Sequence, residues 1–180
     1  MNIQELFNKR IENFKKLNEL SSNVELMAKL IKEAFENKNK ILLCGNGGSA
    51  SDCNHIAAEF ISRFQKERKS LPAISLCANN SIITAIANDY SFDEVFSRQI
   101  EGLGNKNDIL IAISTSGKSR NVIKALETAK KQSLKTILLT GQNKTNLNVD
   151  LEINAPSNIT CEIQEMHIAL AHVICEMVEK

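Results

Sequence analysis

A histidine and a glutamate stand four positions apart at His55 and Glu59, in a segment whose apolar spacing predicts a helix. Residues four apart lie on one helix face, one turn from each other, so the imidazole and the carboxylate can act together. Such a pair suits general acid–base chemistry or the binding of a metal ion. A solvated ion pair on a helix surface has the same spacing, so both interpretations remain open for this pair alone.

The last predicted helix, residues 159–178, carries two histidines and a glutamine among apolar residues. They are His167, His172 and Gln164. A core or interface histidine is the ordinary explanation for each imidazole, and His167 keeps that interpretation. Gln164 and His172 are eight residues apart, or about 12 Å along a helix. One metal ion could bind both only if the side chains lean together or come from different subunits.

A hydroxyl-rich turn lies between a predicted strand and a predicted helix. It reads Ser114-Thr115-Ser116-Gly117-Lys118-Ser119. The N–H groups of a helix N-terminus are unpaired and favour anions, and each hydroxyl can donate a further hydrogen bond, so we predict a phosphate site. A Ser/Thr turn that only caps the helix is the alternative. A nucleotide P-loop is excluded, because its first glycine would fall at Ala112.

A glycine-rich loop follows the first predicted strand and precedes a helix. It reads Gly45-Asn46-Gly47-Gly48-Ser49-Ala50, which fits the G-x-G-x-x-[GA] pattern of dinucleotide enzymes. Those enzymes place an acidic residue at the end of the second strand, whereas residues 76–80 here contain no carboxylate. We therefore expect no nucleotide cofactor. The glycines are predicted to let a ligand approach the backbone, with Ser49 adding a hydroxyl.

Strand-like and helical patterns alternate after an N-terminal helical segment. Short apolar runs typical of strands buried on both faces occupy residues 40–44, 72–76, 108–113 and 136–140, with a weaker one at 151–153. Helical patterns occupy residues 3–20, 24–35, 51–64, 82–88, 92–103, 120–131 and 159–178. The alternation predicts an α/β fold with a five-stranded parallel sheet flanked by helices. We expect one domain, residues 1–180, with a helical segment to about 37 and an α/β core from about 38.

Composition narrows the function classes. The 180 residues carry a net charge of +1 and only 4% aromatic residues, which argues against nucleic acid as a partner. The five cysteines are odd in number and form no CxxC motif, which is typical of reduced cysteines in a cytosolic protein. No signal-peptide pattern or apolar stretch of bilayer length is present in the sequence. We expect a cytoplasmic protein without membrane contact.

Six short motifs follow one another along nearly the whole chain. They are Cys44-Gly45-Asn46-Gly47-Gly48-Ser49, His55-x-x-x-Glu59-x-x-x-Arg63, Ala87-Asn88-Asp89, Phe96-Ser97-Arg98-Gln99, Ile113-Ser114-Thr115-Ser116-Gly117-x-Ser119, and Ile163-Gln164-Glu165-x-His167 with His172. In order and spacing, these motifs closely resemble phosphoheptose isomerase (sedoheptulose-7-phosphate isomerase), a branch of the sugar isomerase (SIS) domain superfamily.

The resemblance implies an SIS-type three-layer sandwich, N-terminal helices that pack in an oligomer, and a homotetramer with zinc-containing active sites between subunits. It implies conversion of D-sedoheptulose 7-phosphate to D-glycero-D-manno-heptose 7-phosphate for surface-polysaccharide heptose synthesis. Glu59 corresponds to the base and His172 to the acid. The implied metal ligands are His55, Glu59, Gln164 and His172. The implied substrate contacts are Asn46, Gly47, Gly48, Ser49, Glu59, Asn88, Asp89, Ser114, Thr115, Ser116, Ser119 and Gln164.

Two departures from the family pattern concern the preferred sugar more than the reaction type. Glu162 replaces the usual arginine, and Gln142-Asn143-Lys144 lacks the paired glycines often found there. Three other functions stay open: a non-enzymatic SIS tetramer that binds the replication initiator, a module that senses a sugar phosphate, and an isomerase of another sugar phosphate. Initiator-binding relatives lack the carboxylate of Glu59 and the imidazole of His172, which favours an enzyme.

Overall fold

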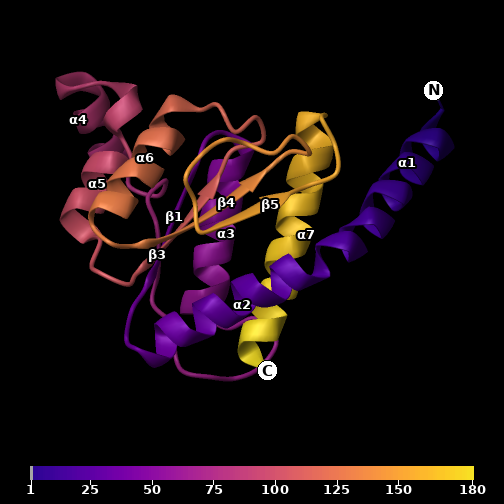
Figure 1. Ribbon diagram of the computed structural model, residues 1–180, viewed down its shortest axis with the longest axis horizontal. Helices are drawn as coiled ribbons and strands as arrows, with labels where there is room; N and C mark the ends of the chain where they lie inside the picture. Colours follow the sequence, from indigo (N-terminus) through magenta and orange to yellow (C-terminus); the bar gives the residue numbers. More distant parts are fainter. Residues whose placement is uncertain (1) are drawn as a thin grey trace.

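The computed structural model describes residues 2–180 and contains a five-stranded parallel sheet between two layers of helices (Figure 1). The strand order is β2-β1-β3-β4-β5, and every neighbouring pair is parallel. The strands are β1 Ile41–Gly45, β2 Ala73–Ser75, β3 Ile109–Ile113, β4 Lys135–Thr140 and β5 Leu151–Asn154. The predicted α/β class and parallel sheet are confirmed.

The helices follow the predicted order with shifted ends. They are α1 Ile3–Lys16, α2 Ser21–Glu36, α3 Gly48–Ile61, α4 Asn80–Asp89, α5 Ser97–Leu103, α6 Arg120–Lys131 and α7 Thr160–Glu179, with 3₁₀ helices η1 Leu17–Leu20 and η2 Phe92–Glu94. The helix predicted for residues 51–64 begins three residues earlier, because Gly47 adopts a φ of +56° and turns the chain directly into α3. The helix predicted for residues 92–103 is divided into η2 and α5.

Successive strand residues point to opposite faces of the sheet, so each strand contributes to two hydrophobic cores. On one face, Ile41 and Leu43 share a core with residues of α2, α3 and α7. On the other face, Leu42 and Cys44 pack in a core with residues of α5 and α6. Burial on both faces explains why the strands read as continuous apolar runs in the sequence.

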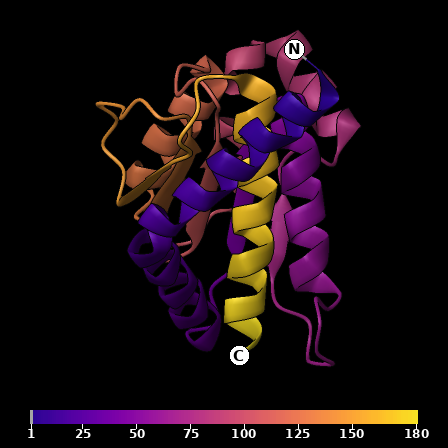
Figure 2. The ribbon, with the colours of Figure 1, turned by 90° about the vertical axis from the view of Figure 1, so that its right-hand side faces the viewer.

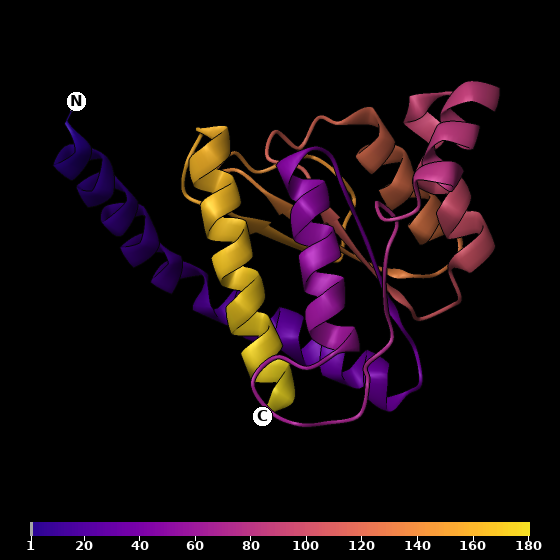
Figure 3. The ribbon, with the colours of Figure 1, turned by 180° about the vertical axis from the view of Figure 1, so that it is seen from behind.

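Helices α3 and α7 lie side by side on one face of the sheet and run in the same direction (Figure 3). Helix α1 crosses the N-terminal half of α7 (Figure 2) and then extends past the edge of the sheet. Its apolar side chains Ile3, Phe7 and Ile11 are 71%, 62% and 53% exposed, so this face of α1 has no covering partner within residues 2–180. Among the described helices, none combines the length and the apolar character that crossing a membrane requires.

Candidate active site

The glycine loop (residues 45–50) and the serine loop (residues 114–119) are neighbours, because β1 and β3 are adjacent parallel strands and end at the same edge of the sheet. The two loops are joined by reciprocal amide hydrogen bonds. Asn46 Nδ2 donates to Asn121 Oδ1, and Asn121 Nδ2 donates to Asn46 Oδ1, both at 2.9 Å. Asn121 is buried in the first turn of α6 and was not predicted as a site residue; an amide two residues after the serine loop was its only signal.

The serine loop is a tight turn with its hydroxyls clustered. Gly117 has a φ of +65°, and its N–H donates to the Ser114 carbonyl at 3.0 Å. The Ser114 hydroxyl donates to the Ser119 hydroxyl at 3.2 Å, and Ser116 Oγ accepts from the Lys118 N–H at 3.1 Å. Ser119 is the N-cap residue of α6, but its side chain makes no capping hydrogen bond. Val122 N–H in the first turn of α6 donates to Asn121 Oδ1 at 2.9 Å, which leaves the N–H groups of Arg120 and Asn121 as the donors that a predicted phosphate would use.

In the glycine loop, Gly48 permits a close contact with α7. A Cβ atom on Gly48 would lie 2.5 Å from Gln164 Nε2, so only a glycine lets the Gln164 amide lie in its present position over the first turn of α3. Ser49, the next residue, is buried. The structure thus places Gln164 beside the predicted substrate-binding loop.

Seven residues further along α3, the predicted acid–base pair is formed. His55 Nε2 lies 2.9 Å from Glu59 Oε1. The same imidazole nitrogen lies 3.3 Å from Nε2 of His172, which projects from α7. The Glu59 side chain is 24% exposed, and that of His55 is 46% exposed, so a ligand can reach both. One chain therefore brings His55, Glu59 and His172 together.

Three other predicted site residues, Gln164, Asn88 and Asp89, lie away from the cluster of His55, Glu59 and His172. Gln164 contacts Gly48 and His172 contacts His55, which are about 10 Å apart along α3. Within one chain, Gln164 is thus separated from the other three predicted metal ligands. Asn88 and Asp89 are exposed at the end of α4, where Asn88 Nδ2 donates to Asp89 Oδ1 at 2.9 Å.

The two imidazoles fit a divalent metal ion. In a tetrahedral zinc site with Zn–N bonds of about 2.0–2.1 Å, two ligand nitrogens lie roughly 3.3 Å apart. The His55 and His172 Nε2 atoms are also 3.3 Å apart.

A carboxylate lies one turn before His55 on α3. The buried Oδ2 atom of Asp52 lacks a hydrogen-bond partner within the described protein. Burial raises the pKa of this carboxyl, and the nearby His55 lowers it. No group of three or more His, Cys, Asp or Glu side chains in residues 2–180 is arranged to hold a metal ion. The geometry of a zinc site is therefore matched by the two imidazoles, but not by a complete set of ligands.

His167 is a core histidine, as predicted. It is 1% exposed, and its Nε2 lies 3.1 Å from the Thr140 carbonyl, to which it donates as the N–H tautomer. Burial lowers the pKa of His167 to about 4, with the Thr140 hydrogen bond acting in the opposite direction. The imidazole is therefore neutral at neutral pH.

Glu162, the charge reversal in the family pattern, faces α1. Its carboxylate contacts Lys9 Nζ at 2.7 Å, Asn13 Nδ2 at 2.9 Å and the Ser157 hydroxyl at 2.7 Å. These hydrogen bonds outweigh burial and lower the pKa of Glu162 to about 2, with Lys9 contributing most. The structure thus gives Glu162 a role in holding α1 on α7.

The second departure, residues 142–144, lies beside the serine loop. Asn143 and Lys144 line a cavity of about 640 Å³ that is also lined by Thr115 and Gly117. Residues 142–144 therefore help to shape the surroundings of the serine loop.

Together, the parallel sheet, the serine loop and the glycine loop define an SIS domain: the SIS domain family model matches residues 5–141. A phosphoheptose isomerase from Nitratiruptor sp. is 53% identical over 150 residues, which cover 82% of this chain and 80% of the relative. Another from Helicobacter pylori (strain P12) is 49% identical over 168 residues, covering 92% and 88%.

Solved structures show the same similarity. A phosphoheptose isomerase from Francisella tularensis matches with a TM-score of 0.94 at 35% identity, covering 99% of this chain and 97% of that chain. One from Neisseria gonorrhoeae matches with a TM-score of 0.92 at 37% identity, covering 98% and 96%. This chain belongs to the phosphoheptose isomerase family, as the sequence motifs predicted.

Proposed function

We propose that this protein interconverts D-sedoheptulose 7-phosphate and D-glycero-D-manno-heptose 7-phosphate through an enediol. The observation that carries the proposal is the meeting of Glu59, His55 and His172 on the face of α3 that begins at the glycine and serine loops. Family membership supports the reaction class. A carboxylate and an imidazole next to an anion site are the groups that a ketose–aldose isomerisation needs.

The two loops are proposed to bind the sugar phosphate at its phosphate end. The substrate contacts would be Asn46, Gly47, Gly48, Ser49, Glu59, Asn88, Asp89, Ser114, Thr115, Ser116, Ser119 and Gln164. Ser49 and Glu59 are ten residues apart on α3, or about 15 Å along the helix axis. A seven-carbon chain spans such a distance better than a three-carbon one. Phosphate binding would thereby orient C1 and C2 at Glu59.

Glu59 and His172 are proposed to divide the proton transfers. Glu59 removes a proton from C1 of the ketose, and His172 donates a proton to the C2 carbonyl oxygen, which forms the enediol. The proton on the C1 oxygen then passes to His172, and Glu59 returns its proton to C2 to give the aldose. Each residue ends in its starting protonation state, so the cycle balances.

We further propose that His55, Glu59, Gln164 and His172 are the ligands of a zinc ion. Bound zinc would polarise the substrate carbonyl and stabilise negative charge on its oxygen. Because Gln164 lies apart from the other three within one chain, its participation needs a neighbouring subunit.

A homotetramer with active sites between subunits would supply that neighbour. The exposed apolar face of α1 supports such packing. We propose that this assembly acts in the cytoplasm and supplies heptose for surface polysaccharides.

An NMR assay of the purified protein with sedoheptulose 7-phosphate, with and without a chelator, tests the reaction and the metal together. We expect the aldose product to form, and a chelator to slow its formation in a way that added zinc reverses. Absence of product from any heptulose phosphate, with tight binding to a protein partner instead, would favour the non-enzymatic SIS tetramer.

A further inference from the structure

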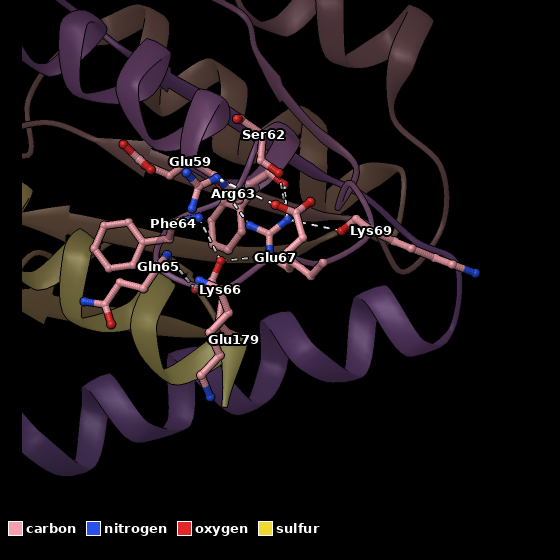
Figure 4. Close-up of polar contacts among 11 residues, drawn as sticks. Glu59, Ser62, Arg63, Phe64, Gln65, Lys66, Glu67, Lys69 and Glu179 are labelled. Atoms are coloured by element: carbon pink, nitrogen blue, oxygen red, sulfur yellow. Dashed lines mark hydrogen bonds and ion pairs between the residues drawn. The ribbon is translucent and has the colours of Figure 1, made fainter.

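The last turn of α7 holds the segment that follows α3. The Glu179 carboxylate accepts hydrogen bonds from three successive backbone N–H groups (Figure 4): those of Phe64 at 2.7 Å, Gln65 at 2.8 Å and Lys66 at 3.0 Å. Three N–H groups converging on one carboxylate fix the backbone of this segment. We call residues 62–72, which connect α3 to β2, the α3–β2 connection.

Arg68 completes this contact. Its Nε donates to Glu179 Oε1 at 3.0 Å, while its guanidinium also donates to the carbonyls of Glu59 at 2.7 Å and Phe60 at 2.8 Å. Those carbonyls belong to the last turn of α3, where carbonyl groups have no N–H donor within the helix. The Arg68 and Glu179 side chains are 16% and 2% exposed, so the pair is shielded from solvent. The end of α7 is thereby tied to the end of α3.

The Glu179 carboxyl stays ionised at neutral pH. Burial raises its pKa, but the backbone N–H groups of Gln65, Phe64 and Lys66, together with Arg68, outweigh burial and lower it to about 2. A neutral side chain at this position would accept these hydrogen bonds more weakly and would leave the Arg68 guanidinium without a compensating charge, which is costly for groups shielded from water.

The α3–β2 connection places an aromatic ring against the proposed catalytic acid. The Phe64 ring centroid lies 5.5 Å from that of His172, with 31° between the ring planes. The His55 ring lies 5.1 Å from His172. The His172 imidazole therefore contacts Phe64 as well as His55, and the Phe64 backbone is held by Glu179.

We propose that Glu179 is a positioning residue for the isomerase reaction: by fixing the α3–β2 connection, it holds the Phe64 ring where it orients the His172 imidazole. This inference rests on the proposed role of His172 as the acid. Glu179 acts through Phe64 and contacts neither the substrate nor the reacting atoms. A small misplacement of a catalytic group lowers the turnover rate more than it weakens substrate binding.

The test compares Glu179→Gln with Glu176→Gln. Glu176 stands one turn earlier on α7, and its ion pair within residues 2–180 is with Lys180, at 3.0 Å, so its loss is the matched control. We expect kcat to fall about tenfold in Glu179→Gln, with KM changed less than twofold, and to stay unchanged in the control. Glu179→Asp, which keeps the charge, should recover part of kcat.

A second measurement separates this inference from the proposed reaction. The ring-current shift that Phe64 imposes on the His172 ring protons, observed by NMR without substrate, should disappear in Glu179→Gln. Phe64→Leu, which keeps the backbone hydrogen bonds, should lower kcat by a similar factor, and the double variant should be no worse than either single one. An unchanged His172 spectrum, or additive losses, would overturn the inference. A wild-type protein that fails to isomerise the sugar would overturn only the proposed function.

Discussion

Replacing Glu162 by glutamine tests whether this carboxylate holds α1 on α7. The side chain is 4% exposed and accepts hydrogen bonds from Lys9, Asn13 and Ser157. A pKa lowered from its usual 4.5 to about 2 is worth at most about 3 kcal/mol of stability at neutral pH. Lys9 is 42% exposed, so solvent screens the interaction that contributes most. We therefore expect a loss of about 1–2 kcal/mol.

Urea unfolding of wild type and Glu162→Gln at equal protein concentration, at pH 7 and pH 3, measures this contribution. The folded-state pKa is depressed, so the stabilisation is complete above the unfolded pKa of about 4.5 and is lost as pH falls towards about 2. The difference between the two proteins should therefore shrink by about half at pH 3. Glutamine cannot ionise, so the contribution of residue 162 to the free energy of unfolding does not depend on pH in the variant.

Glu165→Gln is the matched control, because Glu165 also joins α7 to α1. It pairs with Arg10 at 3.3 Å, but its side chain is 41% exposed. We expect this variant to lose less than about 0.5 kcal/mol. Equal losses in the two variants, or a Glu162→Gln loss that stays constant with pH, would refute the argument.

Two further predictions concern residues near the site. Gly48→Ala should raise KM for the sugar phosphate while changing stability by less than about 1 kcal/mol, because its Cβ would displace only the flexible end of Gln164; an unchanged KM would remove Gln164 from substrate binding. His167, with a folded pKa of about 4, binds fewer protons than in the unfolded chain between about pH 4 and 6.5. Wild type should therefore lose about 1–2 kcal/mol more than His167→Asn between pH 7 and pH 5 in urea unfolding, and equal losses would contradict this.

Local patterns predicted the sheet and both loops. Continuous apolar runs such as Ile109–Ile113 indicated strands buried on both faces, and parallel strands place their following loops at one edge. The contact between His55 and Glu59 follows from their spacing of four within a helix. Each of these predictions depends on residues that are close in sequence.

Contacts between distant helices could not be predicted in the same way. His172 meets His55 because α3 and α7 pack at one particular register, set by a shared core that includes Phe60, Leu170 and Ile174. No sequence spacing specifies that register. The contacts of Glu162 and Glu179 were also not predictable, because the sequence shows that these residues are charged but not which residues they bind. Asn121 pairs with Asn46 only because β1 and β3 are neighbours.

The most direct measurement of the central claim is turnover and binding of sedoheptulose 7-phosphate by Glu59→Gln. Glutamine keeps the size of the side chain but cannot accept a proton from C1, so we expect turnover to fall by at least about a hundredfold. Binding of the sugar phosphate should persist, because the loops that hold the phosphate are untouched. Wild-type turnover in this variant would contradict the assignment of Glu59 as the base.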